Sequence, residues 1–121
     1  MLQNYNVYCL VKAQSKQEAK TKIINSLNFY NIGHYINVDK INIIIGDIEK
    51  DCFGLTFERY EEISNIISIV IHSAANVNMI SSYLDLYNVN VAGTRRIIEF
   101  CMQNKAKKLH YISSMAIFDS D

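Results

Sequence analysis

Four short apolar runs, rich in β-branched and aromatic residues, alternate with stretches of helical periodicity along this chain of 121 residues. The runs occupy residues 5–12, 41–46, 68–72 and 108–113. They follow one another at intervals of roughly 30 residues, enough for a strand, a crossover helix and the turns between them. Near-continuous apolar strands separated by helices are typical of a parallel sheet covered on both faces. The sequence therefore predicts a doubly wound α/β fold with a parallel sheet between two helix layers.

Three stretches between these runs carry apolar residues at helical spacing. The first begins at Ser15, whose spacing to Glu18 matches a capping box. The second covers about residues 56–66 and the third about residues 81–104. We expect one helix in each stretch.

Length, charge and cysteine spacing limit the class of protein. A chain of this length suits a single domain over residues 1–121. The 12 basic and 12 acidic residues cancel, so no overall field attracts nucleic acid or an anionic membrane. No apolar run reaches the roughly 18 residues of a membrane span. Cys9, Cys52 and Cys101 are isolated and lack disulfide or zinc-site spacing. We expect a cytoplasmic protein without a metal site.

In an open parallel sheet, ligands bind at the carboxyl ends of the strands, so the residues at the end of each run and directly after it are the candidates. Lys12 ends the first run and would either bind an adenosine 2′-phosphate or remain a solvated charge. Asp47 follows the second run, where it would accept from an adenine amino group or cap a turn.

The third and fourth runs are followed by small and hydroxyl-bearing residues. Ser73, Ala74 and Ala75 would let a ribose approach the backbone or would pack a loop closely on a helix. Asn is intrinsically unfavourable inside a helix, and Asn90 lies in a predicted one. Its side chain would therefore either lie on the surface or serve a functional site. Ser113 and Ser114 would form a turn or donate a hydrogen bond to a substrate carbonyl oxygen. His72 and His110 lie within apolar runs, where we expect packing roles.

Six motifs, taken in order, resemble the extended short-chain dehydrogenase/reductase superfamily. More narrowly, they resemble the terminal thioester-reductase domains of nonribosomal peptide synthetases and their fatty acyl-CoA reductase relatives. The motifs are VYCLVKA (7–13), IIIGDI (43–48), FGLTFERY (53–60), VIHSAANVN (70–78), YLDLYNVNVAGT (83–94) and LHYISSMAIF (109–118). The fold implied is a Rossmann-like, three-layer αβα sandwich.

This resemblance implies a set of site residues and NADPH as the cofactor. Lys12 would contact the 2′-phosphate, where the family usually has Arg. Asp47 and Ile48 would flank the adenine. The other implied cofactor-binding residues are Ser73, Ala74, Ala75, Asn90 and Ser113. Asn90 would brace the active-site end of its helix, with Gly93 and Thr94 packing that helix closely, and Ser114 would be the catalytic hydroxyl.

Two family features are missing from the 121 residues. The Gly-rich turn after the first strand is absent, because the four glycines (Gly33, Gly46, Gly54 and Gly93) are scattered. No Tyr and Lys four residues apart follow Ser114. We therefore expect an internal part of a reductase, from its second strand to just past its fifth. Without the first strand, the sheet would be incomplete and would split into two strand pairs with unpaired inner edges. That predicts marginal stability, self-association, or direct pairing of residues 7–12 with residues 68–72.

The function implied is that of an NADPH-dependent reductase in the parent protein. Its substrate would be an acyl or peptidyl thioester, bound to the phosphopantetheine arm of a carrier domain or to CoA. The product would be an aldehyde or an alcohol, and we expect the isolated chain to be inactive. Two alternatives stay open: a non-catalytic remnant or interaction module, and an extended reductase or epimerase acting on nucleotide sugars or sterols.

Overall fold

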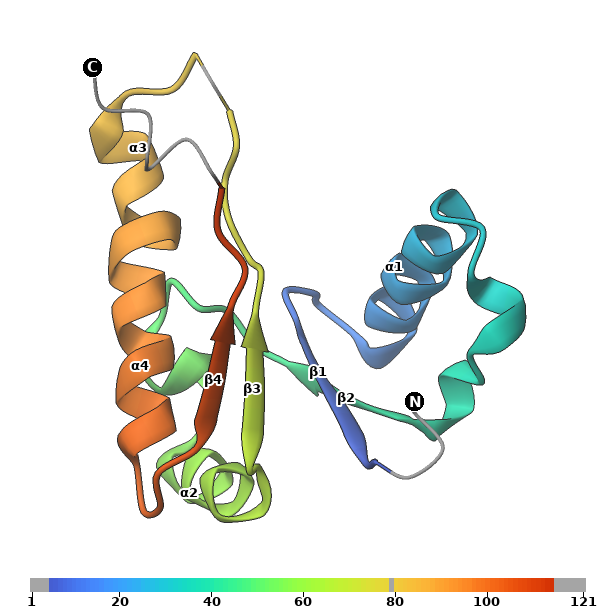
Figure 1. Ribbon diagram of the computed structural model, residues 1–121, viewed down its shortest axis with the longest axis horizontal. Coiled ribbons are helices and arrows are strands. Elements are labelled where there is room, and N and C mark those ends of the chain that lie inside the picture. Colours follow the sequence, from blue (N-terminus) through green and yellow to red (C-terminus); the bar gives the residue numbers. More distant parts are fainter. Residues whose placement is uncertain (1–4, 79, 115–121) are drawn as a thin grey trace. The chain divides into compact units, whose positions relative to one another are not determined.

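The computed structural model describes residues 5–78 and 80–114, drawn as coloured ribbons in Figure 1. These residues form two compact units, which divide between residues 47 and 48. Unit one covers residues 1–47 and unit two covers residues 48–121. Each unit is an α/β structure with one short parallel sheet. The α/β class predicted from the alternating runs is therefore confirmed.

Unit one is a strand, a helix and a second strand parallel to the first. The elements are β1 (Val7–Val11), α1 (Lys16–Phe29), 3-10 turns at Gly33–Tyr35 and Val38–Lys40, and β2 (Ile41–Ile45). The pairing runs from Val7 opposite Ile41 to Val11 opposite Ile45. Among residues 5–47, the buried apolar residues are Ala19 of α1 and Ile44 of β2. The two predicted strands thus meet in one parallel pair.

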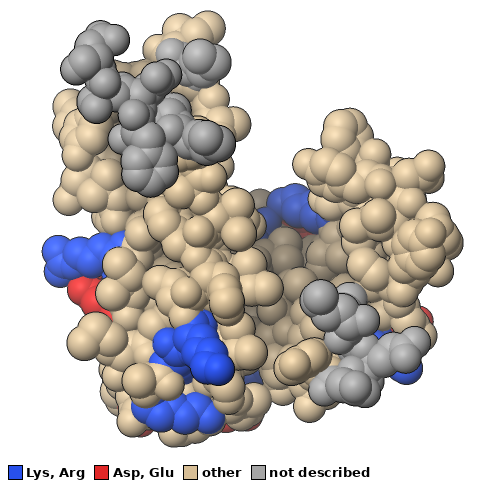
Figure 2. All heavy atoms as spheres, in the orientation of Figure 1, with Lys and Arg blue, Asp and Glu red and all other residues tan. Residues whose placement is uncertain are grey.

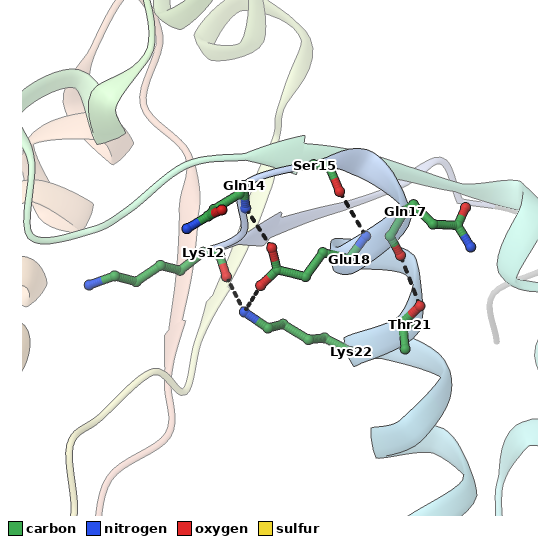
Figure 3. Close-up of polar contacts among 7 residues, drawn as sticks. All are labelled: Lys12, Gln14, Ser15, Gln17, Glu18, Thr21 and Lys22. Atoms are coloured by element: carbon green, nitrogen blue, oxygen red, sulfur yellow. Dashed lines mark hydrogen bonds and ion pairs between the residues drawn. The ribbon is translucent and has the colours of Figure 1, made fainter.

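The start of α1 follows from Ser15, as the sequence predicted. The Ser15 hydroxyl accepts a hydrogen bond from the Glu18 N–H at 3.1 Å, which satisfies one of the free donors at the helix start. The Glu18 carboxylate accepts from the Gln14 N–H at 2.8 Å, instead of from the Ser15 N–H of a capping box. Figure 3 shows both contacts. Glu18 therefore ties the turn after β1 to the first turn of the helix.

Unit two contains the other strand pair and most of the core. Its elements are a 3-10 turn (Asp51–Gly54), α2 (Phe57–Ile66), β3 (Ile69–His72), α3 (Tyr83–Tyr87), a π-helical turn (Asn88–Gly93), α4 (Thr94–Met102) and β4 (Lys108–Tyr111). β3 and β4 are parallel, with Ile69 opposite Lys108 and His72 opposite Tyr111. The helix predicted over residues 81–104 is therefore interrupted by a π-turn, in which the backbone bonds skip one extra residue.

Three aromatic rings form the centre of the core of unit two. Phe53, Tyr60 and Phe100 lie with ring centroids 5.3–5.4 Å apart, in tilted or edge-to-face arrangements that suit aromatic quadrupoles. Phe53 reaches the core through a left-handed turn, because Cys52, Phe53 and Gly54 all have positive φ (49°, 57° and 72°). That backbone is unfavourable for Cys and Phe, by roughly 1–2 kcal/mol per residue. Burial of the Phe53 ring among the other two offsets this cost.

The C-terminal end of α4 is closed by a buried lysine. Lys107 is 9% exposed, and its ammonium donates to the Gln103 carbonyl (2.7 Å), the Lys105 carbonyl (3.0 Å) and the Ser64 hydroxyl (3.1 Å). A cation at this end also complements the helix dipole. Burial lowers the pKa of Lys107. The lysine thus fixes the turn from α4 into β4.

The two sheets contain the strand pairs predicted for a sheet that lacks its middle strand. β1 pairs with β2 and β3 pairs with β4, and each sheet has two strands among the described residues. In β3, Val70 and His72 point to one face while Ile69 and Ile71 point to the other, where Ile71 is 71% exposed. Most of the surface in Figure 2 carries neither basic nor acidic side chains.

Candidate functional site

In unit one, the two predicted cofactor residues meet at the carboxyl ends of β1 and β2. The Lys12 ammonium lies 2.8 Å from a carboxylate oxygen of Asp47, with the Lys12 side chain 68% exposed and that of Asp47 13% exposed. The Lys12 carbonyl is held from below by the Lys22 ammonium at 2.7 Å, and Lys22 also pairs with Glu18 (Figure 3). The backbone at the strand end is therefore fixed, while the Lys12 side chain extends outward.

Tyr8 and Lys12 have the four-residue spacing of the family's Tyr–Lys pair. Tyr8 lies in β1, and Lys12 follows directly after it. Residues four apart in an extended strand are separated by about 13 Å. Tyr8 and Lys12 therefore lie too far apart along the strand to act as that pair.

In unit two, the predicted segment Ser73–Ala75 follows the end of β3, and all three of its side chains are exposed. The residue before it, His72, is 3% exposed, and the residue after it, Asn76, is half-buried. Beyond Asn76, two Asx turns continue the loop: the Asn78 N–H donates to the Asn76 side chain and the Ile80 N–H to the Asn78 side chain, both at 3.2 Å. The exposed small residues thus lie between two residues that are held more firmly.

The Asn90 side chain binds both backbone groups of Asn76. Its Oδ1 accepts from the Asn76 N–H at 2.7 Å, and its Nδ2 donates to the Asn76 carbonyl at 2.9 Å. An amide is the side chain that can satisfy a donor and an acceptor of one residue together. This explains why a helix tolerates Asn at this position, where its propensity is poor.

Thr94 and His72 extend this contact to the end of β3. The Thr94 hydroxyl donates to the Asn90 carbonyl at 2.8 Å, four residues earlier in the same helix. His72 Nε2 lies 3.0 Å from the same hydroxyl oxygen. The imidazole stacks on the Tyr111 ring, with centroids 5.2 Å apart and planes inclined by 18°. Burial lowers the pKa of His72, which favours the neutral ring.

Ile48 packs against the π-turn at Gly93. Gly93 is buried, and a Cβ at that position would lie 3.0 Å from Ile48 Cδ1 and 3.3 Å from the Asn88 carbonyl oxygen. The absence of a side chain therefore lets Ile48 approach the helix backbone. This is the close helix packing that the resemblance implied for Gly93.

Ser113 and Ser114 follow β4 at the same end of the sheet as Ser73. Pairing of the strands continues one residue beyond β4, because the Ile112 N–H donates to the His72 carbonyl at 2.9 Å. Both serines are exposed. The segments that begin at Ser73 and at Ser113 therefore leave the sheet at the same end. Both serines belong to the motif LHYISSMAIF (109–118), of which residues 115–118 lie outside the described residues.

The predicted residues are thus gathered into two groups, one in each unit. Unit one holds Lys12 and Asp47, and unit two holds Ile48, Asn90 and the residues after β3 and β4. Sequence reasoning did not find the roles of His72 and Asn76 as hydrogen-bonding partners. The spacing of Asn90 and Thr94, four residues apart on a helix, was the available signal for the bond between them. His110, expected to pack, is exposed, because it lies opposite Ile71 in the parallel register and shares the sheet face on which Ile71 is exposed.

A separate hollow of about 270 Å³ in unit two contains none of the predicted residues. It is lined by Asp51, Cys52, Phe53, Phe57, Tyr60, Arg96, Glu99 and Gln103. Arg96 donates to Asp51 at 3.0 Å.

Within residues 5–78 and 80–114, no cluster of His, Cys, Asp and Glu could hold a metal ion. In that same part of the chain, no helix is long and apolar enough to cross a membrane.

The family model for NAD-binding domains described as male sterility protein matches residues 1–121. The chain belongs to this family. Among curated relatives, the nonribosomal peptide synthetase asaC of Aspergillus flavus is 35% identical over 93% of the chain and 11% of its own length. Probable polyketide synthase 44 of Dictyostelium discoideum is 36% identical over 95% of the chain and 4% of its own length. The chain therefore spans a small part of these relatives.

Solved structures of R domains share the fold. The terminal R domain of the myxalamid pathway has a TM-score of 0.85 and 29% identity, over 94% of this chain and 29% of that domain. The reductase domain of a Mycobacterium tuberculosis nonribosomal peptide synthetase has a TM-score of 0.77 at 22% identity, over 95% of this chain and 28% of that one, which supports the fold alone. The resemblance inferred from the six motifs, and the Rossmann-like fold it implied, are confirmed.

Proposed function

We propose that this chain supplies part of an NADPH-dependent reductase domain that reduces a thioester to an aldehyde or an alcohol. The acyl or peptidyl group would be carried on the phosphopantetheine arm of a carrier domain or on CoA. The observation that carries the proposal is the likeness to the myxalamid R domain, at a TM-score of 0.85 and 29% identity. The family matched and the synthetases among the relatives support it.

The residues of unit one suit the adenosine end of the dinucleotide. Lys12 is a mostly exposed cation at a strand end, and an ammonium with three N–H groups can bind a carboxylate and a phosphate together. We assign it to the 2′-phosphate, which distinguishes NADPH from NADH. Asp47 would accept from the adenine amino group, and Ile48, the first residue of unit two, would contact the ring.

The residues of unit two suit the ribose and the reacting carbonyl. Ser73, Ala74 and Ala75 present small exposed side chains, which allow a sugar to approach the backbone. Asn90 would brace the helix beside the cofactor, and Ser113 would line the cofactor. Bound NADPH would supply the hydride. Ser114 would donate a hydrogen bond to the carbonyl oxygen, where negative charge develops during reduction.

Lys12→Gln tests the proposed cofactor, with Lys40→Gln as the matched control. Lys40 belongs to the same unit but lies at the opposite end of β2 from Asp47. Losing one charged contact to a phosphate should raise the KM for NADPH by roughly tenfold or more, and leave NADH nearly unaffected. The control should change neither. Equal effects on both dinucleotides, or none on NADPH, would contradict the assignment.

The substrate class is tested by turnover of the full-length protein with an acyl-CoA and with a carrier-bound acyl thioester. The proposal predicts NADPH oxidation and an aldehyde or alcohol product. Turnover with a nucleotide sugar or a sterol would instead favour the other branch of the superfamily. If no substrate is turned over and no dinucleotide binds, the chain is a non-catalytic remnant or interaction module.

The 121 residues alone should bind NADPH weakly and show no turnover. In calorimetry, micromolar affinity of the isolated chain would contradict this. Each described sheet has two strands, and strand edges without partners favour pairing between chains. We therefore propose self-association of the isolated chain, to be tested by sedimentation.

The free thiols Cys9, Cys52 and Cys101 suit the reducing cytoplasm, where we place the protein.

A further inference from the structure

The exposed segment Ser73–Ala75 is held at both of its ends by the same stretch of helix. At the strand end, the His72 ring contacts the Thr94 hydroxyl at 3.0 Å. At the loop end, both backbone groups of Asn76 bind the Asn90 side chain, at 2.7 and 2.9 Å. Asn90 and Thr94 are in turn joined by a bond of 2.8 Å. We call these four residues the β3–helix network.

The direction of the hydrogen bonds in this network follows from counting protons. A threonine hydroxyl has one proton, and the Asn90 carbonyl can only accept, so the Thr94 proton is donated to that carbonyl. The Thr94 oxygen must then accept from His72 Nε2, which therefore carries the ring proton. A neutral ring with its proton on Nε2 leaves Nδ1 as an acceptor. The chain of donors runs in one direction, from His72 through Thr94 to Asn90.

The network lies on an unusual piece of helix. Asn90 belongs to the π-turn Asn88–Gly93, and Thr94 begins α4 directly after it. π-turns are rare and occur mostly as single turns near functional sites. Gly93 lets Ile48 pack against this turn, which supports it from a second side. The turn is therefore fixed by packing and by hydrogen bonds before any ligand binds.

We infer that His72 and Thr94 are positioning residues, which fix the backbone of Ser73–Ala75 in the conformation that receives the dinucleotide. The inference rests on the proposed function. His72 is 3% exposed and Thr94 is half-buried, and the two side chains contact each other between β3 and the helix. They would therefore act through the segment between His72 and Asn76. A loop that is ordered in advance loses less conformational freedom on binding, so the network increases affinity without contacting the cofactor.

Thr94→Val removes the hydroxyl and keeps the shape of the side chain, whereas Thr94→Ser keeps the hydroxyl. Thr21→Val is the matched control, because the Thr21 hydroxyl makes the same bond to a carbonyl four residues earlier, at 2.9 Å, on the exposed face of α1. Asn90→Asp is a second variant without a change in volume, and it replaces the donor to the Asn76 carbonyl with an oxygen.

The measurements are made on the full-length protein. In steady-state kinetics, Thr94→Val and Asn90→Asp should raise the KM for NADPH about tenfold with kcat little changed, as expected for the loss of one hydrogen bond. Thr94→Ser and Thr21→Val should stay within about twofold. Without any ligand, amide hydrogen exchange of residues 73–78 should accelerate in Thr94→Val and Asn90→Asp alone.

Unchanged exchange of residues 73–78 in both Thr94→Val and Asn90→Asp would overturn the inference. So would a loss of kcat with KM unchanged, or a failure of Thr94→Ser to restore the wild-type KM. A further outcome is that exchange accelerates as expected while the wild-type protein binds no dinucleotide. In that case the proposed function is wrong, but the network still orders residues 73–78. The ligand-free and kinetic measurements therefore separate the two claims.

Discussion

At the carboxyl ends of β1 and β2 the candidate residues are charged and meet in one ion pair, Lys12 with Asp47. At the end of β3 they are small and neutral, and the β3–helix network holds them through four hydrogen bonds. An exposed ion pair contributes at most about 1 kcal/mol to folding. Buried hydrogen-bonded groups cost more to disrupt, because their partners lose water without compensation. Substitutions in unit one should therefore affect ligand choice, and those in unit two both stability and binding.

The largest effect on stability is expected from Asn90→Leu. It leaves the N–H and the carbonyl of Asn76 without their side-chain partner, which should lower the free energy of unfolding by about 2 kcal/mol. Asn65→Leu is the control, since the Asn65 side chain bonds a carbonyl on the exposed face of α2, and its cost should be within about 0.5 kcal/mol. Urea denaturation of both variants measures the difference. Equal costs would remove the contrast between the units.

A smaller effect is expected from Gly93→Ala. The added methyl group would lie 3.0 Å from Ile48 Cδ1, so the side chain must shift, at a cost of about 1 kcal/mol. Ile48→Val removes that Cδ1 atom and should recover part of the loss in the double variant. Thermal denaturation of the two single variants and the double variant gives the coupling. Purely additive effects would show that the π-turn and Ile48 are not packed as described.

The dependence of stability on pH should also differ between the units. Burial lowers the pKa of His72 from its ordinary 6.5, so its contribution to stability is complete above about pH 6.5 and is lost as pH falls through the folded pKa. In unit one, hydrogen bonds from Lys20 and Lys22 lower the pKa values of Asp39 and Glu18, so their contributions are lost only below about pH 4.5.

Between pH 7.5 and 5, protection against hydrogen exchange, corrected for the intrinsic dependence of the exchange rate on pH, should therefore fall in unit two before unit one. His72→Gln should remove this difference, because glutamine does not titrate. A parallel loss of protection in both units would contradict the role assigned to His72.

The smallest effect on stability is expected from Lys12→Ala. The pair with Asp47 involves a lysine side chain that is 68% exposed, and water and salt screen such pairs. The free energy of unfolding should change by less than about 1 kcal/mol, and raising the salt concentration should reduce even that difference. Denaturation at low and high salt measures both. A cost that exceeds that of Asn90→Leu would reverse the proposed contrast.

Local sequence patterns predicted most of the elements. Ser15 and Thr56 stand at the N-caps of α1 and α2, and each accepts a hydrogen bond from the N–H three residues later. The strand bounds differ from the apolar runs by two residues or fewer. These features depend on neighbouring residues, and neighbours are what a sequence shows directly.

Features that depend on distant contacts could not be predicted in the same way. The π-turn has the apolar spacing of an ordinary helix, because one skipped bond changes the periodicity too little to see over six residues. The bond between His72 and Thr94 joins residues 22 apart. The left-handed backbone at Cys52 and Phe53 has no sequence signal beyond the following Gly54, since core packing stabilises it.

Hydrogen exchange of the full-length protein with and without NADPH is the most direct test of the proposal that the residues after β1 and after β3 bind the cofactor. We expect slower exchange on NADPH binding in residues 12–16 and in residues 73–78, with Lys12→Gln needing roughly tenfold more NADPH for the same effect in both. Residues 38–41, at the opposite ends of the unit-one strands, should not change. Exchange that slows in neither segment, or in the opposite strand ends instead, would contradict the account.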